Sequence, residues 1–254
     1  MHRSFDAEAA NLIINDPEVF ATIAKPGLER LDVTEFVRDP GNVLMMAEGG
    51  AILFAHDIEP GFYEVHTNFL PGFRGAHAIE ASLAAYRWMF THTDCMMIRT
   101  RVPAPNRPAA MAARAAGFVP RFVRAQVWPA ADGPVDLRYY ELAYADWVSR
   151  ARGELVAAGV AFHHRLDEER ARHGVTAPGH ADDPAHDLYV GAAIETVYGG
   201  QPEKAVILYN RWARFAGYCQ IALVARSPLI IDIGDAVLLI EDGTFKVVSC
   251  RPAL

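Results

Sequence analysis

Two residues suited to proton transfer, Glu64 and His66, stand two positions apart in the aromatic and branched stretch Phe62 to Leu70. Imidazole titrates close to neutral pH and a carboxylate can accept a proton, so both residues are candidate general bases. Partial alternation and the Pro-Gly pair that follows predict a strand, which places both side chains on one face. The alternative is that both are ordinary strand residues without a catalytic role.

The pair Arg74-Gly75 precedes a segment, Ala76 to Phe90, that contains no proline. Apolar residues recur there at spacings of about three and four, which predicts an amphipathic helix. The residues of this apolar face are Ala78, Ile79, Leu83, Tyr86 and Phe90. A helix that begins after a tight turn directs unpaired N–H groups at whatever lies above the turn, and pyrophosphate is the natural occupant. The alternative is a turn that only leads into a helix.

Other elements must position these residues. The short apolar run Met96 to Val102 predicts a buried strand, parallel to the first across a helical crossover. A short helix is expected from about Pro108 to Gly117. The flanks predict a helix at Ala7 to Ile23, a hairpin at Asn42 to His56, and two strands at Phe122 to Trp128 and Asp136 to Tyr144.

This order of strand, Arg-Gly turn, long helix, strand and Asn-initiated helix resembles the central segment of the GNAT acetyltransferase superfamily. The family turn, Arg/Gln-x-x-Gly-x-Gly/Ala, aligns with RGAHAI at positions 74–79, and NRPA at 106–109 with Gly117-Phe118 is similar to the helix beside the pantetheine arm. The resemblance implies an α/β (α+β) fold with a mixed sheet and flanking helices over residues 1–148. The acetyl-CoA residues that it implies are Phe69, Leu70, Arg74, Gly75, Ala76, His77, Ala78 and Asn106.

Three positions depart from the family pattern. His77 and Ile79 add side-chain volume where small residues let the backbone approach phosphate, and Ala113 stands where many members have a tyrosine that protonates the departing thiolate. The acetyl-CoA site is therefore predicted to be degenerate. If the chain is active, Glu64 or His66 is the expected base for an acceptor amine.

A narrower resemblance, to GNAT-like proteins of tailed phages, lies in VHTNFLPGFRG, WMFTHTDC and VPAPNRPA. It implies a virion structural or head-assembly component, with other phage virion proteins or further copies of the chain as partners. The expected location is the host cytoplasm during assembly and then the virion. The alternative function is an acetyl-CoA-dependent N-acetyltransferase that modifies an amine on a protein or small molecule.

The rest of the chain predicts a helical and flexible connector at 149–183, with its flexible part from Gly174 to Pro184, and a C-terminal domain at 184–254. That domain is expected to hold a helical hairpin and an antiparallel sheet or barrel. The predicted helices and strands are Pro184 to Val197, Pro202 to Phe215, Ile221 to Ala225, Leu229 to Ile233, Ala236 to Glu241 and Phe245 to Cys250. Trp212 and Phe215 are expected to pack on the sheet, although the nearby arginines also fit a nucleic-acid or protein contact.

Composition limits the classes of function. The chain has 254 residues, 52% hydrophobic and 22% charged, which is typical of globular domains. A net charge of −7 argues against a dedicated nucleic-acid binder, and no apolar run is long enough to predict a membrane span or a secretory signal. Three cysteines without zinc spacing predict reduced thiols. His163 and His164 point to different sides of a helix, so no metal site is expected.

Overall fold

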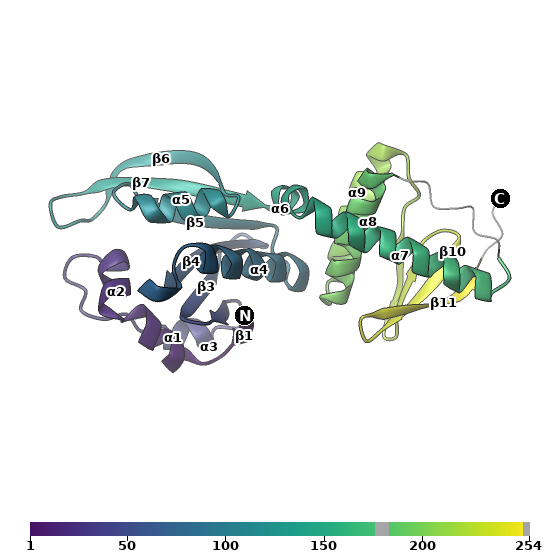
Figure 1. Cartoon of the computed structure of the whole chain (residues 1–254), viewed down its shortest axis with the longest axis horizontal. Coiled ribbons are helices and arrows are strands. Elements are labelled where there is room, and N and C mark those ends of the chain that lie inside the picture. Colours follow the sequence, from purple (N-terminus) through teal and green to yellow (C-terminus); the bar gives the residue numbers. More distant parts are fainter. Residues whose placement is uncertain (176–182, 251–254) are drawn as a thin grey trace. The chain divides into compact units, whose positions relative to one another are not determined.

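The computed structural model describes residues 1–175 and 183–250, and the chain divides into two compact units (Figure 1). The first unit comprises Met1–Phe90 and Cys95–Trp147, and the second comprises Thr91–Asp94 and Val148–Leu254. Residues 176–182 of the predicted flexible link lie outside the described residues. None of the helices in the described ranges has the length and apolar character needed to cross a membrane.

The first unit confirms the expected mixed sheet with flanking helices. Its strands are β1 (His2–Ser4), β2 (Val43–Ala47), β3 (Gly50–His56), β4 (Phe62–Phe69), β5 (Met97–Pro103), β6 (Val119–Trp128) and β7 (Val135–Ala143). Its helices are α1 (Ala7–Ile14), α2 (Pro17–Ile23), α3 (Thr34–Arg38), the 3-10 helix η1 (Pro71–Phe73), α4 (Ala76–His92) and α5 (Arg107–Ala115), and α6 (Tyr144–Arg150) lies at the boundary with the second unit.

The seven strands follow the order β1-β2-β3-β4-β5-β7-β6, and β4 and β5 form the one parallel pair among the pairings of the described sheet. Helix α4 provides the crossover between them, as predicted. The parallel pairing covers only Phe62–Glu64 with Met97–Arg99, although β4 continues to Phe69 and β5 to Pro103. The two strands therefore separate towards their carboxyl ends.

Helices pack on both faces of this sheet. On one face, Ala10 and Ile14 of α1 join a core with Leu44 and Leu53 of the first hairpin. On the other face, Tyr86 of α4 meets the ring of Phe54 edge-on, with centroids 6.1 Å apart. Burial of these apolar faces is the main force that holds the three layers together.

Two details of the helices differ from expectation. The single helix predicted from Ala7 to Ile23 is two helices, because Asp16 caps α2 through the N–H groups of Glu18 and Val19 while Pro17 occupies its first turn. Proline and an N-cap aspartate start a new helix rather than extend the previous one. Leu83, assigned to the apolar face of α4, is 40% exposed.

The second unit contains the predicted helix pair and antiparallel sheet. Its helices are α7 (Arg152–Arg172), α8 (Pro184–Tyr198) and α9 (Pro202–Ala216), and its strands are β8 (Ala222–Arg226), β9 (Leu229–Asp232), β10 (Ala236–Glu241) and β11 (Thr244–Cys250). The sheet order is β11-β10-β9-β8, and every neighbouring pair is antiparallel. Leu166 of α7 packs against Leu238 and Phe245, which places part of the core between α7 and the sheet.

The aromatic residues of α9 divide between core and surface. Trp212 is partly buried, and its ring stacks on that of Tyr189 of α8 with centroids 4.4 Å apart. It therefore packs in the core against a helix. Phe215, however, is 86% exposed, and the expectation that it packs on the sheet is wrong. Phe215 lies in the last turn of α9, which ends at Ala216.

Candidate functional site

The polar residues Glu64 and His66 lie on one face of β4, as alternation predicts. Register pairs Glu64 with Ala55 and with Arg99, and His66 with Leu53, so both side chains leave the sheet on the face that α1 covers elsewhere. His66 is beyond the last residue of β4 that pairs with β5. It therefore stands where the two parallel strands separate, which in open α/β sheets is where ligands bind.

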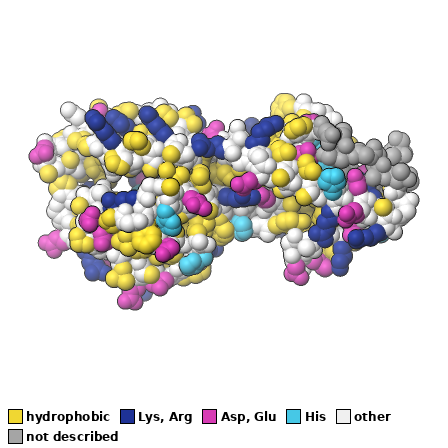
Figure 2. Space-filling view, viewed as in Figure 1, with side chains coloured by type: hydrophobic (Ala, Val, Ile, Leu, Met, Phe, Trp, Pro, Cys, Tyr) yellow, Lys and Arg dark blue, Asp and Glu magenta, His cyan; other side chains and the backbone are white. Residues whose placement is uncertain are grey.

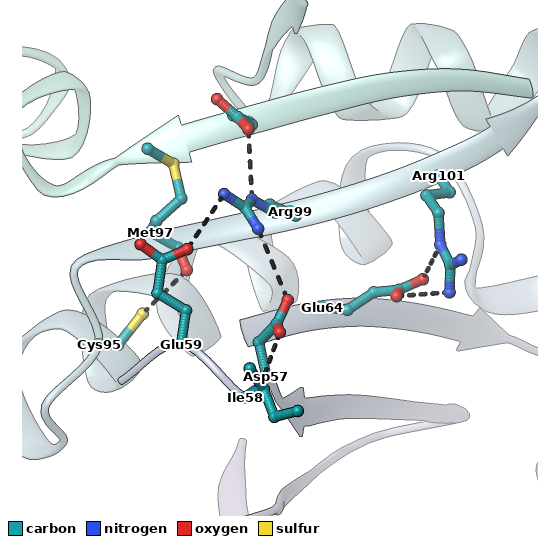
Figure 3. Close-up of polar contacts among 9 residues, drawn as sticks. Asp57, Ile58, Glu59, Glu64, Cys95, Met97, Arg99 and Arg101 are labelled. Atoms are coloured by element: carbon teal, nitrogen blue, oxygen red, sulfur yellow. Dashed lines mark hydrogen bonds and ion pairs between the residues drawn. The ribbon is translucent and has the colours of Figure 1, made fainter. Parts of the chain in front are cut away.

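Glu64 is held by Arg101 of β5 (Figure 3). The guanidinium donates from Nε to one carboxylate oxygen at 2.6 Å and from an Nη to the other at 2.5 Å. This bidentate pair joins β4 and β5 just where their backbone pairing stops. Because both oxygens of Glu64 are engaged, its carboxylate is better suited to orient a neighbour than to take a proton itself.

That neighbour is His66, whose Nε2 lies 3.4 Å from an oxygen of Glu64. Desolvation by surrounding protein lowers the pKa of His66 below its usual value, Glu64 opposes this shift, and Arg101 adds to it. The side chain is still 54% exposed, so solvent limits the size of the shift. The lowered pKa favours the neutral imidazole, and the side chain is accessible; a general base needs both properties.

A second ionic cluster surrounds Arg99, which lies two residues before Arg101 on β5 (Figure 3). Arg99 of β5 has Glu141 of β7 at 3.2 Å, Asp57 at 3.5 Å and Glu59 at 3.9 Å, and its guanidinium lies over the ring of Phe62. These contacts connect β5, β7 and the loop between β3 and β4. Sequence reasoning missed Arg99 and Arg101; their alternation in MIRTRVP was the available signal, but only sheet register shows which carboxylates they meet.

The turn before α4 has the geometry expected of an anion site at its backbone. Gly75 has φ +74°, in the left-handed region, and a Cβ built there would meet nothing within 4 Å. The first intrahelical bond at this end runs from the N–H of Ile79 to the carbonyl of Gly75, so the N–H groups of Ala76, His77 and Ala78 precede the helical ladder.

The side chain of Arg74 is used inside the protein. Its Nε donates to the carbonyl of Phe69 at 3.1 Å, and an Nη donates to the carbonyl of Glu18 at 3.2 Å. These bonds tie the end of β4 and helix α2 to the turn. Arg74 is exposed as a residue, but the geometry gives it a positioning role at the turn rather than a free guanidinium above it.

His77 and Phe69 brace the hairpin turn that lies beside α4. The Nε2 of His77 is 3.1 Å from the carbonyl oxygen of Glu48, and its ring meets those of Phe69 and Phe73 edge-on. A Cβ at Gly49 would overlap Phe73, and one at Gly50 would overlap Phe69. Gly49 and Gly50 of this turn are therefore required by aromatic packing.

The remaining predicted cofactor residues have different surroundings. Phe69 is 7% exposed, and the N–H of Leu70 donates to the carbonyl of Gly49 at 2.9 Å. The side chain of Phe69 and the backbone of Leu70 therefore stabilise the end of β4. Ala76 is exposed and Ala78 is half-buried at the start of α4. Asn106 caps α5 by accepting a bond from the N–H of Ala109 at 3.2 Å. Ala113 on that helix is buried and offers no acid.

Cationic side chains also occur near the start of α5. On the face shown in Figure 2, Lys and Arg side chains gather over the part of the first unit that α5 and β6 occupy. Exposed arginines on these two elements are Arg107, Arg114, Arg121 and Arg124, and Arg121 is paired with Glu141 at 2.9 Å. They give a locally positive potential to a chain that is acidic overall, which would favour the approach of an anionic ligand.

Comparison with known proteins finds similarity at the level of solved structures. An acetyltransferase of the GNAT family from Bacillus anthracis is 23% identical, covering 55% of this chain and 90% of its own, with a TM-score of 0.45. A spermidine N-acetyltransferase from Vibrio cholerae in complex with CoA and spermine is 13% identical, covering 56% and 92%, with a TM-score of 0.48. A mutant form of the Vibrio cholerae enzyme covers 59% and 98%, again at 13% identity and a TM-score of 0.48.

No protein-family model matches the chain, and no curated protein matches it by sequence. These three structures are described as acetyltransferases, and the one from Bacillus anthracis is assigned to the GNAT family. At identities of 23% or less and TM-scores below 0.5, these similarities assign no activity to this chain.

Proposed function

We propose that the first unit binds an acyl-CoA thioester, such as acetyl-CoA, and transfers its acyl group to an amine. The observation that carries the proposal is the separation of β4 and β5 beside two functional groups: the N–H groups at the start of α4 and the base candidate His66. The first can bind the pyrophosphate, and the second stands on the strand that borders the gap. The motif resemblance supports the same assignment.

The proposed reaction needs one proton acceptor. The nitrogen of a neutral amine attacks the thioester carbonyl carbon, the carbon–sulfur bond breaks, and CoA leaves as the thiolate. The proton released by the nitrogen passes to His66, directly or through water. Glu64, fixed by Arg101, stabilises the imidazolium that forms. Because Ala113 supplies no acid, the thiolate takes its proton from solvent.

Ala76 offers a charge test of the cofactor site. It is the first residue of α4 and is exposed, so Ala76→Asp should keep or improve the helix, because a carboxylate there complements the helix dipole. The same carboxylate repels a pyrophosphate. We expect Ala76→Asp to weaken acetyl-CoA binding at least about tenfold by calorimetry, which corresponds to about 1.4 kcal/mol.

Ala76→Asn is the matched control for that test, because it has nearly the same shape without the charge. It should bind acetyl-CoA within about threefold of the unmodified chain, which corresponds to less than about 1 kcal/mol. Equal affinities for the Asp and Asn variants would show that the N-terminus of α4 does not hold the pyrophosphate.

A role in assembly of a phage particle is the second candidate function. It rests on the resemblance of VHTNFLPGFRG, WMFTHTDC and VPAPNRPA to GNAT-like proteins of tailed phages. Under this proposal the side chains of Arg74 and His77 serve the fold, through their contacts with the carbonyls of Phe69, Glu18 and Glu48. Under this proposal the unmodified chain fails to bind acetyl-CoA, whether or not the double substitution His77→Gly, Ile79→Gly restores binding. Measurable binding by the unmodified chain would remove the degenerate-site argument.

A further inference from the structure

The second unit contains a large pocket that the acyl-transfer proposal does not use. Its volume is about 910 Å³, and residues from α7, α8, α9 and the four-stranded sheet line it. Most of these residues are apolar, such as Val190, Ile231 and Leu238. Two imidazoles, His163 and His186, are also part of the wall. An apolar pocket with a few convergent polar groups is the usual form of a small-molecule site.

The two imidazoles converge with a buried carboxylate. One ligand atom each from His163, His186 and Asp187 lies within 4.8 Å of the others. The Nε2 of His163 is 3.7 Å from Oδ1 of Asp187, and the side chains of these two residues are 13% and 5% exposed. Two nitrogen donors and one carboxylate oxygen at such distances form a common ligand set for transition metals in proteins.

Helix packing fixes the backbone behind this cluster. A Cβ at Gly159 of α7 would overlap the carbonyl oxygen of Asp187, and one at Gly191 of α8 would overlap the carbonyl of Leu155. Gly159 stands four residues before His163, and Gly191 four residues after Asp187, so each glycine shares a helix face with a ligand candidate. The close approach of α7 and α8 therefore sets the distance between His163 and Asp187.

The ring of His186 is oriented by further contacts. Its Nε2 is 3.1 Å from the hydroxyl of Tyr209, and the ring stacks on Tyr218 with centroids 4.3 Å apart and planes at 11°. Histidine ligands of metals generally bond through their second nitrogen to a partner that fixes the ring, and Tyr209 fits that role.

We propose that His163, His186 and Asp187 bind one divalent transition-metal ion of the zinc class. Two imidazoles and one carboxylate suit Zn²⁺, Co²⁺ or Fe²⁺ better than Mg²⁺ or Ca²⁺, which favour oxygen ligands. Three protein ligands leave at least one coordination position open. Because His163 and His186 line the pocket, the open position faces it, where an anionic or carbonyl oxygen of a small molecule can coordinate.

The test uses the full chain without an affinity tag, treated with a chelator and then dialysed. Calorimetry with Zn²⁺ and visible absorption with Co²⁺, both at about pH 7.5, should show one ion per chain with micromolar or tighter affinity. His163→Gln and Asp187→Asn should each weaken binding at least about 100-fold, and Tyr209→Phe should weaken it about tenfold through His186. Circular dichroism confirms that each variant is folded.

Two control variants separate this site from other ligands. His164→Gln changes the adjacent, exposed histidine of the same helix, and Cys219→Ser changes an exposed thiol at the pocket wall; both should bind as the unmodified chain does. The proposal is overturned if neither ion binds, which would leave His163 and Asp187 as a buried ion pair. It is overturned equally if His163→Gln, in folded form, binds Zn²⁺ unchanged.

Discussion

At the scale of single residues, the candidate site of the first unit depends on the contacts among Glu64, His66 and Arg101. Arg101 occupies both oxygens of Glu64, and Glu64 in turn lies beside His66. From the sequence alone, either Glu64 or His66 is a candidate base. The contacts favour His66 as the proton acceptor and Glu64 as its positioning residue. With these roles, substitutions of Glu64 and of Arg101 should shift the pKa of His66 in opposite directions.

The pKa of His66 should be below its usual value of about 6.5 and should respond to both neighbours. Since Glu64 raises this pKa, Glu64→Gln should lower it further; since Arg101 lowers it, Arg101→Gln should raise it. A lowered folded pKa means that stability falls as pH drops from the unfolded value through the folded one. NMR titration of the His66 imidazole carbons measures this pKa in the unmodified chain and in the two variants. Changes of pKa in the opposite directions would contradict the assigned roles.

At the scale of elements, two features position everything else. The parallel strands β4 and β5 separate after three paired residues, because β4 stays with β3 to Phe69 and β5 stays with β7 to Pro103. In the second unit, α7 and α8 meet through Gly159 and Gly191, where only hydrogen fits between the helices. The first feature opens the candidate cofactor site, and the second brings the proposed metal ligands together.

The helix contact predicts contrasting effects of alanine on α7. Gly159→Ala should destabilise the fold by about 1–3 kcal/mol or more, because the new methyl group collides with the backbone of Asp187. Gly153→Ala lies on the same helix with nothing within 4 Å of its Cβ, so it should be neutral or stabilise by about 0.5–1 kcal/mol. Urea denaturation of both variants measures the difference; similar stabilities would show that α7 and α8 are not in close contact.

At the scale of the whole molecule, local sequence patterns predict the helices and strands better than they predict which residues meet in the tertiary structure. The strand at Phe62, the helix after Gly75 and the four C-terminal strands follow from periodicity and turn residues, and they lie within a few residues of expectation. The break at Pro17 is also visible in the sequence as an Asp-Pro pair, which the prediction of one helix from Ala7 to Ile23 does not take into account.

The sites themselves were less predictable, since register and helix packing create them. Arg101 meets Glu64 across 37 positions, and His163 meets Asp187 across 24, distances over which no local pattern carries information. No metal site was expected because adjacent His163 and His164 point to different sides of one helix, whereas the proposed site draws its ligands from α7 and α8. The predicted virion role and degenerate cofactor site stay predictions, because fold alone does not decide between catalysis and assembly.

The most direct test of the central claim is an amide NMR titration of the isotope-labelled chain with acetyl-CoA. If acyl-CoA binds where β4 and β5 separate, the amides of Gly75, Ala76, His77 and Ala78 shift together and saturate at one ligand per chain, with a smaller response at Asn106. An unchanged spectrum at millimolar acetyl-CoA, or shifts confined to the second unit, would contradict the proposed acyl-CoA site.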